Sequence, residues 1–155
     1  MKILNDFSTS VHRALSEIDK NYEIYNGLVI CGTHNPHNVD EMIEEIRIAR
    51  ENNIPTLLIC FGHQIGAIEY ARNVLGIKDA TSEEFGEGTF VVKKRPGLKV
   101  GLHEGESWWS NYDVAIDWKI PKHFISVPFH PEYQSYKGNF HPLLVKFIQN
   151  AKMAM

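Results

Sequence analysis

Short apolar runs alternate with amphipathic stretches along most of the chain. Three runs are four or five residues long and rich in branched side chains, which is typical of strands buried inside a sheet. They occupy residues 27–31, 56–59 and 124–127, and residues 1–4 are a candidate for a further short strand. We therefore expect a sheet of short, buried strands.

Four other stretches carry apolar residues at helical spacing. One follows Ser8 or Thr9, either of which can cap a helix. The others span residues 39–51, span residues 62–75, and begin near Pro142. Strands that alternate with helices through short connections are parallel and joined by right-handed crossovers. The predicted fold class is three-layer α/β, with a mostly parallel sheet and helices on both faces.

The pattern changes in the second half of the chain. Apolar runs at residues 89–92 and 98–102 flank R-P-G at residues 95–97, which predicts a β-hairpin. Residues 114–118 predict another strand. The loop before them carries two tryptophans at residues 108–109, which could line a pocket, contact a partner or pack on the core.

Composition and charge narrow the function classes. At 155 residues we expect a single domain, residues 1–155, and the net charge of −3 provides no basic surface for nucleic acid or an anionic membrane. The two cysteines, Cys31 and Cys60, each end an apolar run, which fits a reducing compartment better than a disulfide scaffold. The apolar runs are too short to span a membrane, and no signal peptide is evident. We expect a cytoplasmic protein.

Cys60 occupies a position suited to a nucleophile. A strand that turns sharply into a helix lifts the turn residue above the carboxyl edge of a sheet. The positive end of the new helix also favours thiolate. The alternative is an ordinary core cysteine, because cysteine is among the most buried residue types.

His130 and Glu132 could supply the partners that such a nucleophile requires. A base must take the thiol proton, and a third group must orient that base. Both residues directly follow the predicted strand 124–127, and Pro131 should keep their segment out of a helix. If the segment is extended, both side chains point to one side, so the carboxylate can hold one ring nitrogen while the other faces Cys60.

These motifs resemble the class I glutamine amidotransferase domain, most closely the type fused to CTP synthase. The family's nucleophile segment, G-I-C-x-G-x-Q, corresponds to L-I-C-F-G-H-Q at residues 58–64, and its F-H-P-E signature stands at residues 129–132. The resemblance extends over residues 27–148. Three further segments are similar to the CTP synthase type in particular: residues 46–55, 68–76 and 81–85.

The resemblance implies a flavodoxin-like fold, shortened by about a strand and a helix before Gly27, and an amidohydrolase activity. In the family, cysteine attacks the side-chain amide of glutamine, a glutamyl thioester forms, ammonia leaves and water releases glutamate. By position Cys60 is the nucleophile, His130 the base and then the acid, and Glu132 the orienting carboxylate.

The resemblance also assigns binding groups. The backbone N–H groups of Thr33 and Phe61 would form the oxyanion hole, and Glu84 would receive the α-ammonium group of the substrate. The positions implied to contact the substrate are Gly32, Gln64, Glu84 and Asn111. Without the resemblance, Gln64 would be a polar residue at a helix start and Glu84 a solvated acid. We expect no cofactor.

Three positions depart from the family pattern. Leu58 stands two residues before the cysteine, where the family usually has a glycine. The turn at Cys60 could therefore be less tight than in the family. Thr33 stands in a loop that is usually P-G-G. Asn111 replaces the arginine that binds the α-carboxylate of glutamine. We therefore expect an intact triad with altered substrate binding.

Three functions therefore remain open. The leading one is an amidohydrolase acting on glutamine or a γ-glutamyl compound, whose ammonia would pass to a separate synthetase. The second is a hydrolase of a larger γ-glutamyl conjugate, which Asn111 and the two tryptophans favour. The third is a non-catalytic binding or regulatory relative, which Leu58 and Thr33 favour and the intact triad disfavours.

A metal site is a weaker hypothesis. His34 and His37 together with His63 or His103 could bind a metal, but structural metal sites show tighter ligand spacing. We expect no metal in this protein.

Overall fold

A central four-stranded sheet carries the fold in the computed structural model, which describes residues 1–32, 38–94 and 112–155. Its order is β1-β2-β3-β7, and each neighbouring pair is parallel. These strands span Lys2–Leu4, Leu28–Ile30, Thr56–Ile59 and Phe124–Val127. The predicted parallel sheet and all four of its strands are confirmed, with boundaries within one residue.

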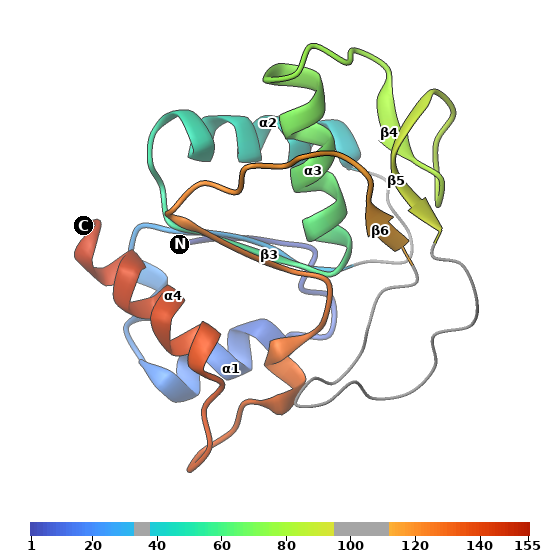
Figure 1. Cartoon of the computed structure of the whole chain (residues 1–155). Coiled ribbons are helices and arrows are strands. Elements are labelled where there is room, and N and C mark those ends of the chain that lie inside the picture. The colour runs from blue at the N-terminus through green and yellow to red at the C-terminus, as the bar shows by residue number, and fades with distance from the viewer. Residues whose placement is uncertain (33–37, 95–111) are drawn as a thin grey trace.

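Helices cover both faces of this sheet (Figure 1). On one face lie α2 (Val39–Glu51) and α3 (Phe61–Asn73), and on the other lie α1 (Ser10–Ile18) and α4 (Pro142–Met153). Two apolar cores result, one between the sheet and α2–α3 and the other between the sheet and α1–α4. Because β2 and β3 are buried at every position, their sequences are predominantly apolar and do not alternate with polar residues. The three-layer α/β prediction is confirmed.

A second, smaller sheet contains the first strand of the predicted hairpin. β5 (Thr89–Lys94) pairs in parallel with β4 (Ala80–Ser82) and antiparallel with β6 (Tyr112–Val114). The predicted hairpin partner, residues 98–102, lies outside the described residues. The strand predicted at 114–118 was wrong in position, because Val114 already pairs with Val92 and ends β6, whereas Trp118 packs partly against the core.

The start of α1 also differs from expectation. Thr9 is the capping residue by position, but its side chain makes no capping hydrogen bond. Instead the carboxylate of Asp6 accepts hydrogen bonds from the backbone N–H groups of Val11 and His12, at 3.1 and 2.8 Å. An acid at this end also suits the positive pole of the helix. The predicted capping role of Ser8 or Thr9 was therefore wrong.

Close packing shapes the turn from β3 into α3. A Cβ atom added at Gly62 would lie 2.4 Å from the carbonyl oxygen of Ile30, so only glycine lets α3 approach β2 this closely. Leu58 is fully buried, and a Cβ atom at Gly66 would lie 2.5 Å from its Cδ1. Gly66 therefore makes the space that the side chain of Leu58 fills.

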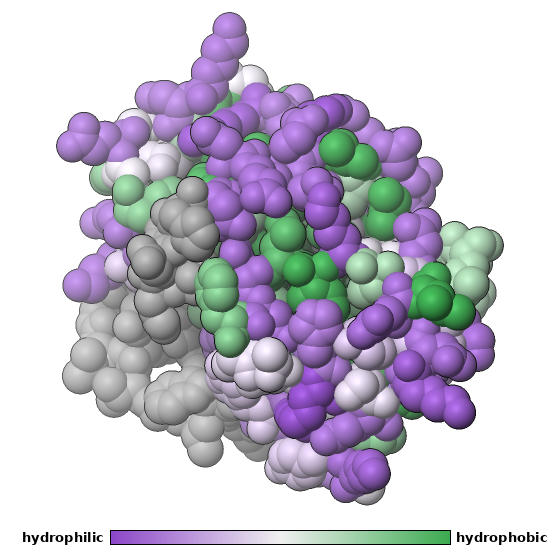
Figure 2. Space-filling view, turned by 180° about the vertical axis from the view of Figure 1, so that it is seen from behind, coloured by the Kyte–Doolittle hydropathy of each residue, from purple (hydrophilic) through white to green (hydrophobic). Residues whose placement is uncertain are grey.

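The reverse face of the molecule is largely hydrophilic, with small hydrophobic patches between polar side chains (Figure 2). Within the described ranges, no helix has the length and apolar character needed to cross a membrane.

Candidate active site

Cys60 lies at the sharp turn between β3 and α3, at the carboxyl end of the central sheet. Its backbone has φ 52° and ψ −105°, a conformation that residues other than glycine rarely adopt. Such strain persists only where the surrounding structure enforces it, and it is frequent at functional sites. The thiol is free and partly exposed. The sharp turn therefore forms although Leu58 replaces glycine.

His130 and Glu132 follow the adjacent strand β7. The segment Pro131–Gln134 forms the 3₁₀-helix η2, so the expectation that Pro131 keeps this segment out of a helix was wrong. Proline is accommodated at the first helical position, because that residue needs no N–H donor there. The ring Nδ1 of His130 still donates a hydrogen bond to Oε2 of Glu132, at 3.1 Å, and the carboxylate is nearly fully buried.

The structure brings His130 together with Cys60 as well. Burial alone would lower the pKa of His130, but its hydrogen bonds with Cys60 and Glu132 outweigh this and raise the pKa to about 9. A carboxylate on one side and a thiol on the other thus stabilise the imidazolium form. This arrangement places a charged imidazolium ring next to the sulfur of Cys60.

Gly32 lies directly against this pair. A Cβ atom at Gly32 would stand 2.9 Å from Cε1 of His130 and 3.2 Å from Cβ of Cys60. Any side chain at this position would therefore push the histidine and the cysteine apart. Thr33, the other residue expected in this loop, lies outside the described residues.

Phe61 is the first residue of α3 and follows the cysteine directly. Its ring is buried against Phe85, with 5.2 Å between the ring centroids. The first N–H groups of a helix have no acceptor within that helix. The backbone N–H of Phe61 is thus placed where a developing oxyanion next to Cys60 could accept its hydrogen bond.

Gln64 and Glu84 are linked through a residue that the sequence did not indicate. Oε1 of the buried Gln64 accepts a hydrogen bond from Oγ of Ser82, at 3.0 Å, and the same Oγ accepts one from the backbone N–H of Glu84, at 3.1 Å. The carboxylate of Glu84 is exposed. Asn111 lies outside the described residues, and only its neighbour Tyr112 is described.

The chain matches a known protein family. The sequence profile of the family described as "Glutamine amidotransferase class-I" matches residues 4–118, well over half of the chain. The chain belongs to the class I glutamine amidotransferase family. Within it, this chain is similar to CTP synthases and to the glutaminase domain of CTP synthase.

Several individual proteins similar to this chain are CTP synthases. CTP synthase of Methanoregula boonei is 47% identical over 46% of this chain and 14% of its own length. CTP synthase of Bdellovibrio bacteriovorus is 28% identical over 90% of the chain and 36% of its own length. The domain thus spans between about a seventh and a third of the length of these relatives. A solved structure, "Trypanosoma brucei CTPS - glutaminase domain with bound acivicin", has a TM-score of 0.71 at 22% identity, covering 91% of this chain and 79% of the other. The fold is therefore that of the CTP synthase glutaminase domain.

Two further residues contact the histidine segment of this amidotransferase domain. The half-exposed ring of Tyr133 stacks on His130, with 4.8 Å between centroids and 17° between planes. Arg13, from α1, donates hydrogen bonds to the backbone of the η2 segment. The position of Tyr133 directly after H-P-E was a signal for the first contact. No local pattern marked Arg13, because it lies more than a hundred residues away.

Metal binding finds no support in the described part of the domain. No group of three His, Cys, Asp or Glu side chains there is arranged to hold a metal ion. Three of the histidines considered from the sequence, His34, His37 and His103, lie outside the described residues. The fourth, His63, makes a hydrogen bond to Ser126 at 2.6 Å.

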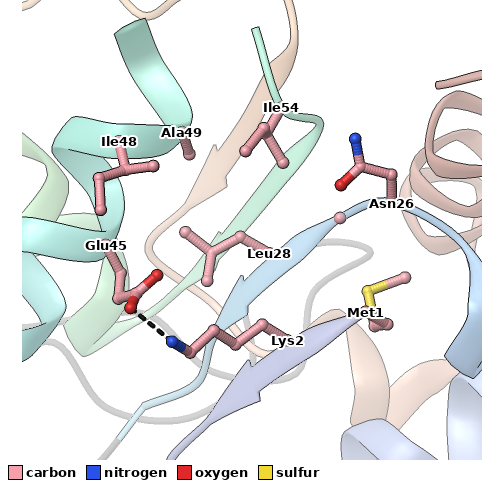
Figure 3. Close-up of a pocket in the computed structure, with 9 residues that line it drawn as sticks. Met1, Lys2, Asn26, Leu28, Glu45, Ile48, Ala49 and Ile54 are labelled. Carbon is pink, nitrogen blue, oxygen red and sulfur yellow. Dashed lines mark hydrogen bonds and ion pairs between the residues drawn. The ribbon is translucent and has the colours of Figure 1, made fainter. Parts of the chain in front are cut away.

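A hollow of about 260 Å³ lies at the opposite edge of the sheet (Figure 3). Side chains from β1, β2 and α2 line it, and Lys2 and Glu45 form an ion pair at its rim. Because Cys60 and His130 follow the carboxyl ends of their strands, whereas Lys2 and Leu28 begin theirs, this hollow is separate from the candidate active site.

The two cysteines differ in a way that can be tested. Cys31 is buried, and burial raises the pKa of its thiol well above the ordinary range. We expect a glutamine-like electrophile, such as a diazo-ketone analogue, to alkylate Cys60 at least about tenfold faster than Cys31, since only thiolate reacts and Cys60 is partly exposed. Peptide mass spectrometry after partial labelling measures the ratio. Equal labelling of both cysteines would contradict the assignment.

Proposed function

We propose that this domain hydrolyses the side-chain amide of glutamine, or of a γ-glutamyl compound, through a thioester on Cys60. The observation that carries the proposal is the hydrogen-bonded series Cys60–His130–Glu132 at the carboxyl edge of the sheet. Nucleophile, base and orienting carboxylate are the three groups that covalent amide hydrolysis by a thiol requires.

The chemistry follows from these positions. The thiolate of Cys60 adds to the amide carbonyl carbon, and the oxyanion that forms accepts a hydrogen bond from the backbone N–H of Phe61. His130 then donates its proton to the departing nitrogen, so ammonia leaves and a thioester remains. Next His130 takes a proton from water as the water adds to the thioester carbonyl. Collapse releases the carboxylic acid and restores the thiolate.

Substrate recognition would use groups beside this series. The exposed carboxylate of Glu84 is suited to the α-ammonium group, and Ser82 holds Gln64 and the backbone of Glu84 in a fixed relation. Gly32 lets His130 and Cys60 approach the backbone at this position closely. We further propose that the ammonia passes to a synthetase. The relatives named CTP synthase support this, because they are much longer than the region they share with this domain.

Free glutamine is expected to be a poor substrate. Asn111 offers neutral donors where the family places an arginine, and losing one charged partner of a carboxylate costs about 1.5–3 kcal/mol, roughly tenfold to a hundredfold in affinity. Steady-state hydrolysis of glutamine beside a panel of γ-glutamyl amides measures this. We expect a high KM for glutamine, and a lower KM either with a masked α-carboxylate or in the presence of a partner that completes the pocket.

The matched control is Asn111→Arg, which should lower KM for glutamine by about tenfold or more and change kcat little. A submillimolar KM for glutamine in the unmodified protein would contradict the expected weak binding of glutamine while leaving the triad proposal intact. Failure of every amide in the panel to react would instead favour the hypothesis of a non-catalytic relative.

A further inference from the structure

Arg13 joins α1 to the segment that carries Glu132. Its Nη2 donates a hydrogen bond to the backbone carbonyl of Glu132, and its Nη1 donates one to the backbone carbonyl of Ser135, both at 2.9 Å. Nη1 also contacts the two carboxylate oxygens of Glu17, one helical turn further along α1, at 3.0 Å each. The guanidinium is therefore held by its own helix and directed at two carbonyls of another element.

The η2 segment needs such a partner. Carbonyl groups at the end of a short helix have no intrahelical donors, so they require donors from elsewhere. The planar fork of arginine can serve two acceptors at once, which a lysine ammonium on a flexible stem does less well. On the other side, the buried Ser135 accepts a hydrogen bond through its hydroxyl from the backbone N–H of His141, at 3.1 Å. This segment is thus fixed between α1 and the start of α4.

The orientation of the Glu132 carboxylate depends on that backbone. One oxygen, Oε2, accepts the hydrogen bond from His130, whereas Oε1 is buried and has no partner among residues 1–32, 38–94 and 112–155. With no second side chain in that part of the chain to hold it, the carboxylate takes its position from the main chain of η2. A shift of this main chain would lengthen the contact with His130.

We propose that Arg13 is a positioning residue for the triad, which holds η2 so that Glu132 meets Nδ1 of His130. This inference rests on the proposed function of Cys60, His130 and Glu132. Arg13 acts through the backbone and touches neither the thiol nor the substrate.

Replacing Arg13 distinguishes a positioning role from a simple charge effect, because the two predict opposite changes in the pKa of His130. The titratable groups that contact His130 include Cys60 before α3, and Glu132 and Tyr133 on η2, while Asp6 and Cys31 act electrostatically on Tyr133. Losing a nearby cation would by charge alone favour the imidazolium and raise the pKa of His130. Losing the hold on Glu132 would weaken the hydrogen bond that favours the imidazolium and lower that pKa.

The experiment compares Arg13→Met, which keeps the length of the aliphatic stem, with the unmodified protein. NMR titration of the His130 ring should show a pKa lower by about half to one unit, the equivalent of weakening one hydrogen bond. Alkylation of Cys60 at pH 7 should slow by roughly threefold to tenfold. Arg13→Lys should restore part of both. The control is Arg47→Met, which removes an arginine paired with two glutamates on α2, and it should change neither.

An unchanged or raised pKa of His130 in folded Arg13→Met, checked by circular dichroism, overturns the inference. If that variant does not fold, Arg13→Lys takes its place. A His130 pKa and a Cys60 alkylation rate in Arg13→Lys that both equal those of the unmodified protein would also overturn the inference. Both readouts are independent of turnover. A lowered pKa in a protein that hydrolyses no amide would therefore reject the proposed function and retain the positioning role.

Discussion

Replacing Cys60 with alanine is expected to lower amide hydrolysis by about 10⁴-fold or more. The reason is that no thioester can form without the sulfur, and no other thiol stands beside His130. The side chain of Cys60 is partly exposed at a turn, so its loss removes little packing. Ammonia release under saturating substrate, together with trapping of the acyl intermediate in acid-quenched samples, measures both the rate and the thioester.

Cys31→Ala is the matched control for this loss. Cys31 ends the adjacent strand region, but it is buried in the core between the sheet and the helices α1 and α4. Because burial raises the pKa of this thiol, it stays protonated and unreactive. The variant should keep the chemical step largely intact with a modest loss of stability. If Cys60→Ala retained hydrolysis, or if Cys31→Ala abolished it in a folded protein, the nucleophile would be assigned wrongly.

Acidification from pH 7 to pH 4.5 is expected to lower the free energy of unfolding by roughly 2.5 kcal/mol through His63 alone. Burial lowers the pKa of His63 from 6.5 to about 4, because its ring is enclosed between Trp118 and the hydrogen bond to Ser126. The unfolded chain binds a proton near pH 6.5, whereas the folded protein resists it until about pH 4. Stability is therefore fully present above pH 6.5 and is lost as the pH falls toward 4.

Urea denaturation at both pH values tests this, with His63→Gln as the comparison. Glutamine can still hydrogen-bond to Ser126 but does not titrate, so its stability should fall by about 2 kcal/mol less than that of the unmodified protein. His141, whose pKa burial also lowers, contributes in the same direction to both proteins and cancels in the comparison. His130 is charged in the folded state over this range, since its folded pKa is raised, and its titration in the unfolded state is the same in both proteins and cancels. An identical loss in both proteins would contradict the role given to His63.

Above neutral pH the stability contribution of His130 should change in the opposite direction, falling as the pH rises. The raised pKa of His130 gives the folded state stability that is complete below pH 6.5 and is lost as the pH rises toward 9. The same residue thus contributes to stability at neutral pH and, in the proposed mechanism, supplies the proton for the leaving nitrogen. Its two hydrogen-bond partners, Cys60 and Glu132, produce both effects.

The predicted sheet and helices came from patterns that are local in the sequence. In the run Thr56–Ile59 the three residues after the threonine are all apolar, and this absence of alternation distinguishes a strand buried on both faces from one with a solvated face. The helix Val39–Glu51 follows from apolar spacing and matches the prediction at both ends. The two motifs around Cys60 and His130 identified the family, because a nucleophile and its base need specific residue types at fixed points of the chain.

Contacts between distant segments decided the rest. The pairing of β5 with β4 and β6 was not predicted, and the conformation after His130 and the hydrogen-bonding cap of α1 were predicted wrongly, since each depends on neighbours that no local pattern names. Asp6 caps α1 from outside the helix, and Val114, which the sequence pattern did not place in a strand with β5, pairs with Val92.

The sequence by itself determined the layered α/β fold, the strand–turn–helix unit at Cys60 and the residue types of the triad. Only the tertiary structure decided that His130 reaches both Cys60 and Glu132, that Ser82 joins Gln64 to Glu84, and that Arg13 supports η2. The physical reason is that hydrophobic periodicity records which face of an element is buried, whereas hydrogen bonds across the fold require distances of about 3 Å between groups that are far apart in the chain. Such distances are set by the packing of the whole domain.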